Sequence, residues 1–142
     1  MRAPEFDAAY IAKGKEYMKK FIKDVYAQGG KANNRDKDTV TYLELAVEMM
    51  ERGLEFEPID LYKSHPTRFL PTEKGVRIPL AALNGIGTSA ALSIDEARSS
   101  GVPFISQEDL RVRSKVSKSV IEKLAEYGTL KDLPENDQID LF

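Results

Sequence analysis

The sequence predicts a mainly α-helical fold with one small β element. Apolar residues recur every three or four positions in the first and last thirds of the chain, whereas residues 54–80 carry short apolar runs between prolines and polar residues. The length of 142 residues fits one ordinary domain, and a hydrophobic content of 42% is enough for a core.

Residues 1–53 are predicted to form a pair of helices. A first helix is expected over residues 5–28, capped by Asp7 and ended by the glycines at positions 29 and 30. Its apolar face holds Tyr10, Tyr17, Phe21 and Val25. A second helix is expected from Asp38 or Thr39 to Arg52, with Gly53 as its C-cap. The short polar segment between the helices favours an antiparallel pair.

Residues 54–80 are predicted to contain a two-stranded element. The runs 68–70 and 76–78 flank the sequence PTEKG, which is typical of a turn. Two short strands joined in this way indicate a hairpin.

The last third predicts four short helices in two helix-turn-helix pairs. The first is expected to end at Asn84 and the second to cover residues 88–98. The third is expected to start after Ser106, with Asp109 in its first turn, and the fourth to cover residues 118–127 and to end at Gly128. The turns that begin at Gly85 and Ser114 lie about 30 residues apart, which fits a duplicated unit.

The turn between the first two of these helices can hold a phosphate. Glycines on both sides of Ile86 permit positive φ and close approach, and the following helix presents free backbone N–H groups. Ile86 itself is expected to point inward. This is the arrangement of a helix-hairpin-helix motif, although an ordinary C-cap glycine with a tight turn explains the same letters. The candidate contacts are Gly85, Ile86, Gly87, Thr88 and Ser89.

The second turn lies in the densest cationic run of the last third. Because the net charge of the chain is −2, any DNA-binding face must be local. The candidate DNA contacts here are Arg111, Arg113, Ser114, Lys115, Val116, Ser117 and Lys118. A solvated basic surface remains the alternative.

The chain ends on a peptide typical of sliding-clamp ligands. Leu141 and Phe142 suit an apolar pocket on a partner, and the amide of Gln138 suits its rim. A frayed end, or a Leu-Phe pair packed on the chain's own core, is the alternative.

The sequence predicts no catalytic, metal or cofactor site. Cysteine is absent, so no thiolate can bind a metal. The acidic pair Asp36 and Asp38 is expected to cap a helix, and His65 to lie at the surface or to cap a turn. No apolar run is long enough for a membrane span, and the first ten residues have no signal-peptide core, so we expect a cytoplasmic location.

These blocks together resemble, in order, the C-terminal region of the PolC-type bacterial DNA polymerase III α subunits. The similarity covers LELAVEMMERG (43–53), IDLYKS (59–64), IPLAALNGIGTSAALSI (78–94), EAR (96–98), ISQEDLRVRSKVSKSVIEKL (105–124) and the terminal QIDLF. The chain departs from the family pattern at Leu80, at Ser114, where glycine is common, and at Asp140, where serine is usual.

The resemblance implies three parts. Residues 1–53 would adjoin the fingers of the polymerase, 54–133 would be a tandem helix-hairpin-helix domain on the template–primer duplex, and 134–142 would be a flexible tail that binds the sliding clamp. The implied partners are double-stranded DNA, the clamp and the rest of the polymerase. The segment would not be an enzyme by itself, and Mg²⁺ would be needed only in the full polymerase.

Two other classes of function remain open. A helix-hairpin-helix repair glycosylase or nuclease needs a catalytic acid or lysine after the hairpin, and Asp95 lies too close to the turn to reach an extruded base. A helical protein-interaction module needs no DNA contact. Salt distinguishes the last class, because phosphate binding weakens steeply with ionic strength and apolar docking does not.

Overall fold

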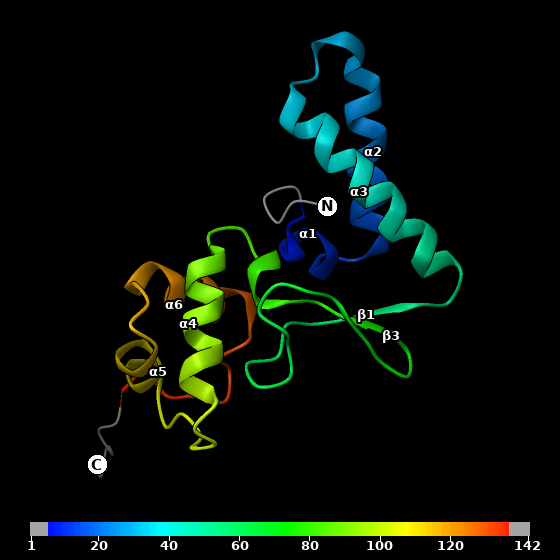
Figure 1. Ribbon diagram of the computed structural model, residues 1–142. Helices are drawn as coiled ribbons and strands as arrows, with labels where there is room; N and C mark the ends of the chain where they lie inside the picture. The colour runs from blue at the N-terminus through cyan, green and yellow to red at the C-terminus, as the bar shows by residue number, and fades with distance from the viewer. Residues whose placement is uncertain (1–5, 137–142) are drawn as a thin grey trace, which may run out of the picture.

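The computed structural model describes residues 6–136, which form six α-helices and a three-stranded sheet. Helices α2 (Lys15–Gln28) and α3 (Asn34–Glu51) form an arm that projects from the body (Figure 1). The sheet lies at the base of the arm, and α4 (Thr88–Arg98), α5 (Gln107–Ser114) and α6 (Lys118–Tyr127) pack at the opposite end. The mainly helical fold is therefore confirmed.

The single helix expected over residues 5–28 is in fact two. Helix α1 (Ala8–Ala12) is capped by Asp7, whose Oδ1 accepts the N–H of Ala9 at 3.0 Å. Gly14 then adopts φ 96°, which a side chain would disfavour, and α2 begins at the next residue. The break places the ring of Tyr10 5.2 Å from that of Phe21 in an edge-to-face contact.

Helix α3 begins earlier than its expected start at Asp38 or Thr39. Asn33 is the cap, because its side chain accepts the N–H of Asp36 at 2.7 Å. Asp36 and Asp38 therefore lie inside the helix and do not cap it. Salt bridges and hydrogen bonds between α2 and α3 include Lys19 to Glu51 at 2.7 Å and Tyr26 to Glu44 at 2.7 Å.

The predicted pair of strands on either side of the turn at 72–74 is present, but the sheet has a third strand, so the expected number of two is wrong. Strand β3 (Gly75–Arg77) pairs antiparallel with β2 (Leu70–Pro71) and parallel with β1 (Glu55–Glu57), giving the order β1-β3-β2. The added strand is only three residues long and has glutamates at both ends. Its alternation of Glu, Phe and Glu is too short to identify a strand from sequence, and the strand forms by pairing with β3.

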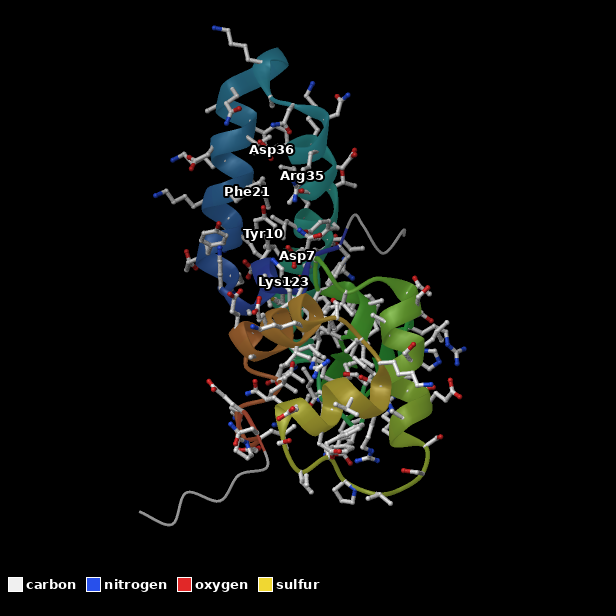
Figure 2. All side chains as sticks on the ribbon, turned by 90° about the vertical axis from the view of Figure 1, so that its left-hand side faces the viewer. Asp7, Tyr10, Phe21, Arg35, Asp36 and Lys123 are labelled. Atoms are coloured by element: carbon white, nitrogen blue, oxygen red, sulfur yellow. The ribbon has the colours of Figure 1, made fainter. Side chains whose placement is uncertain are left out.

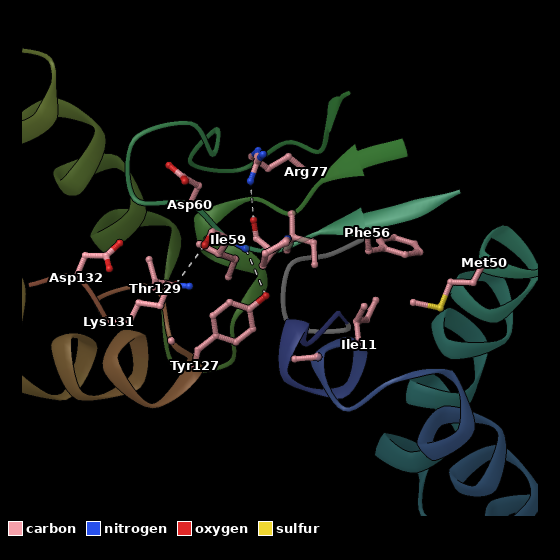
Figure 3. A pocket seen from close by; sticks show the side chains of 14 residues that line it. Ile11, Met50, Phe56, Ile59, Asp60, Arg77, Tyr127, Thr129, Lys131 and Asp132 are labelled. Atoms are coloured by element: carbon pink, nitrogen blue, oxygen red, sulfur yellow. Dashed lines mark hydrogen bonds between the residues drawn. The ribbon is translucent and has the colours of Figure 1, made fainter. Parts of the chain in front are cut away.

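Polar contacts join the segment after β1 to the helices. The hydroxyl of the buried Ser64 accepts the N–H of Asp60 at 2.9 Å and donates to the carbonyl of Ile78 at 2.7 Å. The hydroxyl of Tyr127, at the end of α6, accepts the N–H of Ile59 at 3.3 Å (Figure 3). Burial raises the pKa of Tyr127, so this hydroxyl stays neutral.

One apolar core connects the arm with the body. Its fully buried members come from the arm, the sheet region and all three C-terminal helices: Met18, Leu43, Ile78, Leu80, Ile94, Leu110, Leu124 and Leu130. A smaller cluster of Val25, Ala32 and Val40 fills the outer part of the arm. None of the helices within residues 6–136 has the length and apolar character that crossing a bilayer requires.

We expect Gly75→Ala to disrupt the sheet. A Cβ at Gly75 would collide with the backbone of Glu55, whose nitrogen would lie 2.7 Å away, so β1 would have to separate from β3. Overpacking of this kind should lower the free energy of unfolding by about 1–3 kcal/mol in urea titrations. Gly30→Ala is the control, because nothing lies within 4 Å of its added carbon. Equal stabilities of the two variants would contradict the assignment of β1.

Candidate nucleic-acid interface

The first hairpin connects the 3₁₀ helix η3 (Leu80–Ala82) to α4. In the turn between them, the N–H of Ile86 donates to the carbonyl of Leu83 at 3.0 Å. The α-helix expected up to Asn84 is thus a 3₁₀ helix that ends earlier. The side chain of Ile86 is buried, with 3% exposed, as its predicted inward orientation requires. It anchors the turn in the core, while the residues on either side of it stay exposed.

The two glycines of this turn have different roles. Gly85 has φ 97°, a left-handed conformation that favours glycine. Gly87 has φ −72° and ψ 165°, which any residue adopts, so the expectation of positive φ is wrong here. A Cβ on Gly87 would meet nothing within 4 Å. The fold of the described residues therefore does not require glycine at position 87, and an external group can approach the backbone there.

The first turn of α4 has unsatisfied donors. Gly87 offers no side-chain cap, and the first backbone bond of the helix runs from Ala91 to the carbonyl of Gly87 at 3.0 Å. Among residues 6–136, none accepts the N–H groups of Thr88, Ser89 or Ala90. Thr88 lines a hollow of about 340 Å³ together with the turn and Phe6. The positive end of the helix dipole adds to the attraction of these N–H groups for an anion.

The second hairpin repeats the first with different residues. Lys115, 30 positions after Gly85, has the left-handed conformation with φ 62°, and it follows α5 directly. Val116, with 8% exposed, takes the inward position of Ile86. Ser117 caps α6 by accepting the N–H of Val120 at 3.3 Å. This hairpin therefore satisfies one of the donors that the first leaves open.

Ser114 does not replace a turn glycine in this structure. It is the last residue of α5, only 3% exposed, and its hydroxyl donates to the carbonyl of Leu110 at 2.5 Å. The position that needs a left-handed backbone is Lys115, one residue later. Ser114 is thus a buried packing residue whose hydroxyl is already bonded within α5.

The side chain of Arg113 makes its contacts within the protein. Its guanidinium donates to the carbonyls of Val102 at 2.8 Å and Pro103 at 3.1 Å, and it pairs with Asp109 at 3.2 Å. It also stacks 4.4 Å from the ring centre of Phe104. Arg113 therefore fixes the loop between α4 and α5, and its contact with DNA stays a prediction. Arg111, Lys115 and Lys118 are exposed and form no ion pair with any described residue.

Two residues beside the first hairpin were missed by the sequence reasoning. Lys123 lies on α6 (Figure 2), and its side chain lies against Gly85. The Oδ1 of Asp7 accepts the N–H of Asn84 at 3.3 Å in addition to that of Ala9, and so joins the start of α1 to the turn. Both contacts join segments that are distant in the sequence, so no local pattern reveals them.

The remaining candidates have structural roles. The Nδ1 of His65 accepts the N–H groups of Thr67 and Arg68 at 3.1 and 3.0 Å, which confirms the predicted capping role. Asp95 pairs with Arg98 at 2.6 Å. No group of three or more histidines and acids within residues 6–136 is arranged to hold a metal ion. The clamp-peptide residues Gln138, Leu141 and Phe142 lie outside the described residues.

The comparisons with known proteins agree with this geometry. The family profile described as "Helix-hairpin-helix motif" matches residues 53–139, so the chain belongs to the helix-hairpin-helix family. Over all 142 residues it is 46% identical to DNA polymerase III PolC-type of Caldanaerobacter subterraneus subsp. tengcongensis, 47% to that of Clostridium perfringens and 41% to that of Bacillus subtilis. It spans 10% of the length of each of these relatives, so it corresponds to a short segment of them.

We expect Lys115→Gly to stabilise the protein. Glycine removes the steric conflict between a Cβ and the left-handed backbone, which should raise the free energy of unfolding by about 1 kcal/mol in urea. Lys115→Ala is the matched control, because it loses the same charge and keeps the conflict. If both variants gain equally, the effect comes from the charge and the left-handed assignment is wrong.

Proposed function

We propose that this chain is the double-stranded-DNA-binding part, at the C-terminal end, of a PolC-type DNA polymerase III. It would hold the template–primer duplex behind the catalytic region, in the cytoplasm. The observation that carries the proposal is the exposed first turn of α4, where the N–H groups of Thr88, Ser89 and Ala90 lack acceptors among the described residues beside an open Gly87.

A DNA phosphate fits these donors by charge and by geometry. Backbone N–H groups at a helix start bind phosphate oxygens, and the helix dipole favours their negative charge. The second hairpin has fewer free donors because Ser117 caps α6, and it offers the exposed cations Arg111, Lys115 and Lys118. We therefore assign backbone capture mainly to the first hairpin and electrostatic attraction mainly to the second.

Binding of this kind is independent of base sequence. Main-chain donors and flexible cations reach phosphates, which position a protein on DNA without identifying bases. A replicative polymerase must accept every sequence, so this property suits the role. The proposal requires no metal or cofactor in this segment; Mg²⁺ belongs to the catalytic part of the full polymerase.

The competing functions have less support. The acid that the sequence offers to a repair enzyme, Asp95, is held by Arg98, which also donates to the carbonyl of Leu61 at 2.8 Å. A protein-interaction module would not need the open donors of α4. Its binding would also resist salt, unlike that of a phosphate-binding surface.

We expect Gly87→Val to weaken duplex binding while the fold persists. The valine side chain would occupy the approach to the α4 donors, and its backbone angles remain ordinary. Loss of charge-assisted hydrogen bonds worth about 1.5–3 kcal/mol should lower affinity by about tenfold or more. The measurement is fluorescence anisotropy of labelled duplex across a salt series, with urea titrations to verify folding.

Gly30→Val, at the far end of the arm, is the matched control, since nothing lies within 4 Å of its added carbon either. Substituting Gly85 would be a poorer test, because φ 97° makes any side chain there strained. Absence of wild-type binding at low salt, or equal binding by Gly87→Val, would refute phosphate capture at the first hairpin.

The proposal includes a tether to the sliding clamp through the tail 134–142. Leu141 and Phe142 would enter an apolar pocket of the clamp, with Gln138 bonded at its edge. We expect the double variant Leu141→Ala, Phe142→Ala to lose clamp binding measured by surface plasmon resonance, and to bind duplex as the wild type does. Unchanged clamp binding would remove the tail from the proposal and leave DNA binding intact.

A further inference from the structure

We propose that Lys123 supplies a positive charge to the phosphate site of the first hairpin, although it lies on α6, the helix that follows the turn of the second hairpin. A single DNA phosphate would then be held by the N–H groups of α4 and by the ammonium of a residue on α6. The inference rests on the proposed function, since it names a further contact of the same DNA-binding site.

The stem of Lys123 lies on the glycine turn. From the point where a Cβ of Gly85 would stand, its Cε is 3.2 Å away, and its Cγ and Cδ are each 3.4 Å away. Any side chain at position 85 would therefore press on this stem. Glycine thus serves two purposes at this position: it permits φ 97°, and it leaves room for a lysine to cross the turn.

The ammonium of Lys123 forms no ion pair with any described residue. Asp7 and Glu126 line the same hollow of about 270 Å³, yet neither carboxylate is within salt-bridge distance of it. The Oδ1 of Asp7 already accepts the N–H groups of Ala9 and Asn84. Lys19, by contrast, is paired with Glu51 at 2.7 Å.

The position of Lys123 complements what the α4 donors lack. Helix ends carry only about half an elementary charge, whereas a lysine carries a full one on a flexible stem. Leu83 and Asn84 line both the hollow beside Lys123 and the hollow that Thr88 lines at the start of α4, so the two hollows are adjacent at the turn. In Figure 2, Lys123 and Asp7 are labelled next to each other, as expected for two residues that line the same hollow.

The test uses Lys123→Met, which retains the apolar stem over Gly85 and removes the charge. In the anisotropy salt series on duplex DNA, the slope of log K against log salt should fall by about one, as expected for one phosphate contact. Lys74→Met, in the exposed turn between β2 and β3, is the matched control and should leave the slope unchanged. Lys123→Arg should retain the wild-type slope.

A double-variant cycle locates the contact. If Lys123 and the α4 donors hold the same phosphate, the losses from Lys123→Met and Gly87→Val will not add. The losses from Lys118→Met and Gly87→Val should add, because Lys118 lies at the second hairpin. Additive losses for Lys123 and Gly87 would overturn the shared site.

Failure of this inference is distinguishable from failure of the proposed function. If wild type binds duplex, Gly87→Val weakens binding and Lys123→Met behaves as Lys74→Met, then Lys123 has no part in the site while phosphate capture stands. If wild type does not bind at low salt, the proposed function itself fails, and this inference with it. Urea titrations of Lys123→Met verify that the variant is folded.

Discussion

The burial of one apolar side chain in each hairpin is the constraint on which the interface depends. Ile86 and Val116 are inserted into the core at the middle of their turns, and each must be preceded by a left-handed residue. Once the side chain is buried, the following helix has to start at the surface with its first N–H groups outward. Core packing therefore determines both where α4 and α6 begin and which way their positive ends face.

The two hairpins have diverged in how they treat these helix starts. At α4 a glycine precedes the helix and leaves its donors open, whereas at α6 a serine accepts one of them. The first hairpin also has the conformationally permissive residue at its left-handed position, where the second has Lys115. The second hairpin also has the exposed cations Arg111, Lys115 and Lys118, which form no ion pair with a described residue.

Much of the C-terminal part was predictable because its signals are local. The periodicity of α4 and α6, the Ser106 cap of α5 and the stop at Gly128 all act within a few residues, and the structure confirms them. Strand β1 was missed because its three residues are ordered only by a distant partner. The contacts of Arg113 within the fold were not predicted for a related reason: its charge is visible in the sequence, whereas folding brings the carbonyl groups that accept its hydrogen bonds.

The link between Asp7 and Asn84 has a consequence for where this chain can be divided. The family match begins at residue 53, yet Phe6 contacts the ring of Phe69 at 4.9 Å, and Met18 and Leu43 belong to the same core as Leu124. A fragment starting at residue 53 would expose that apolar surface and free the N–H of Asn84 at the turn of the first hairpin. The residues that match the family profile therefore share their apolar core with residues that precede residue 53.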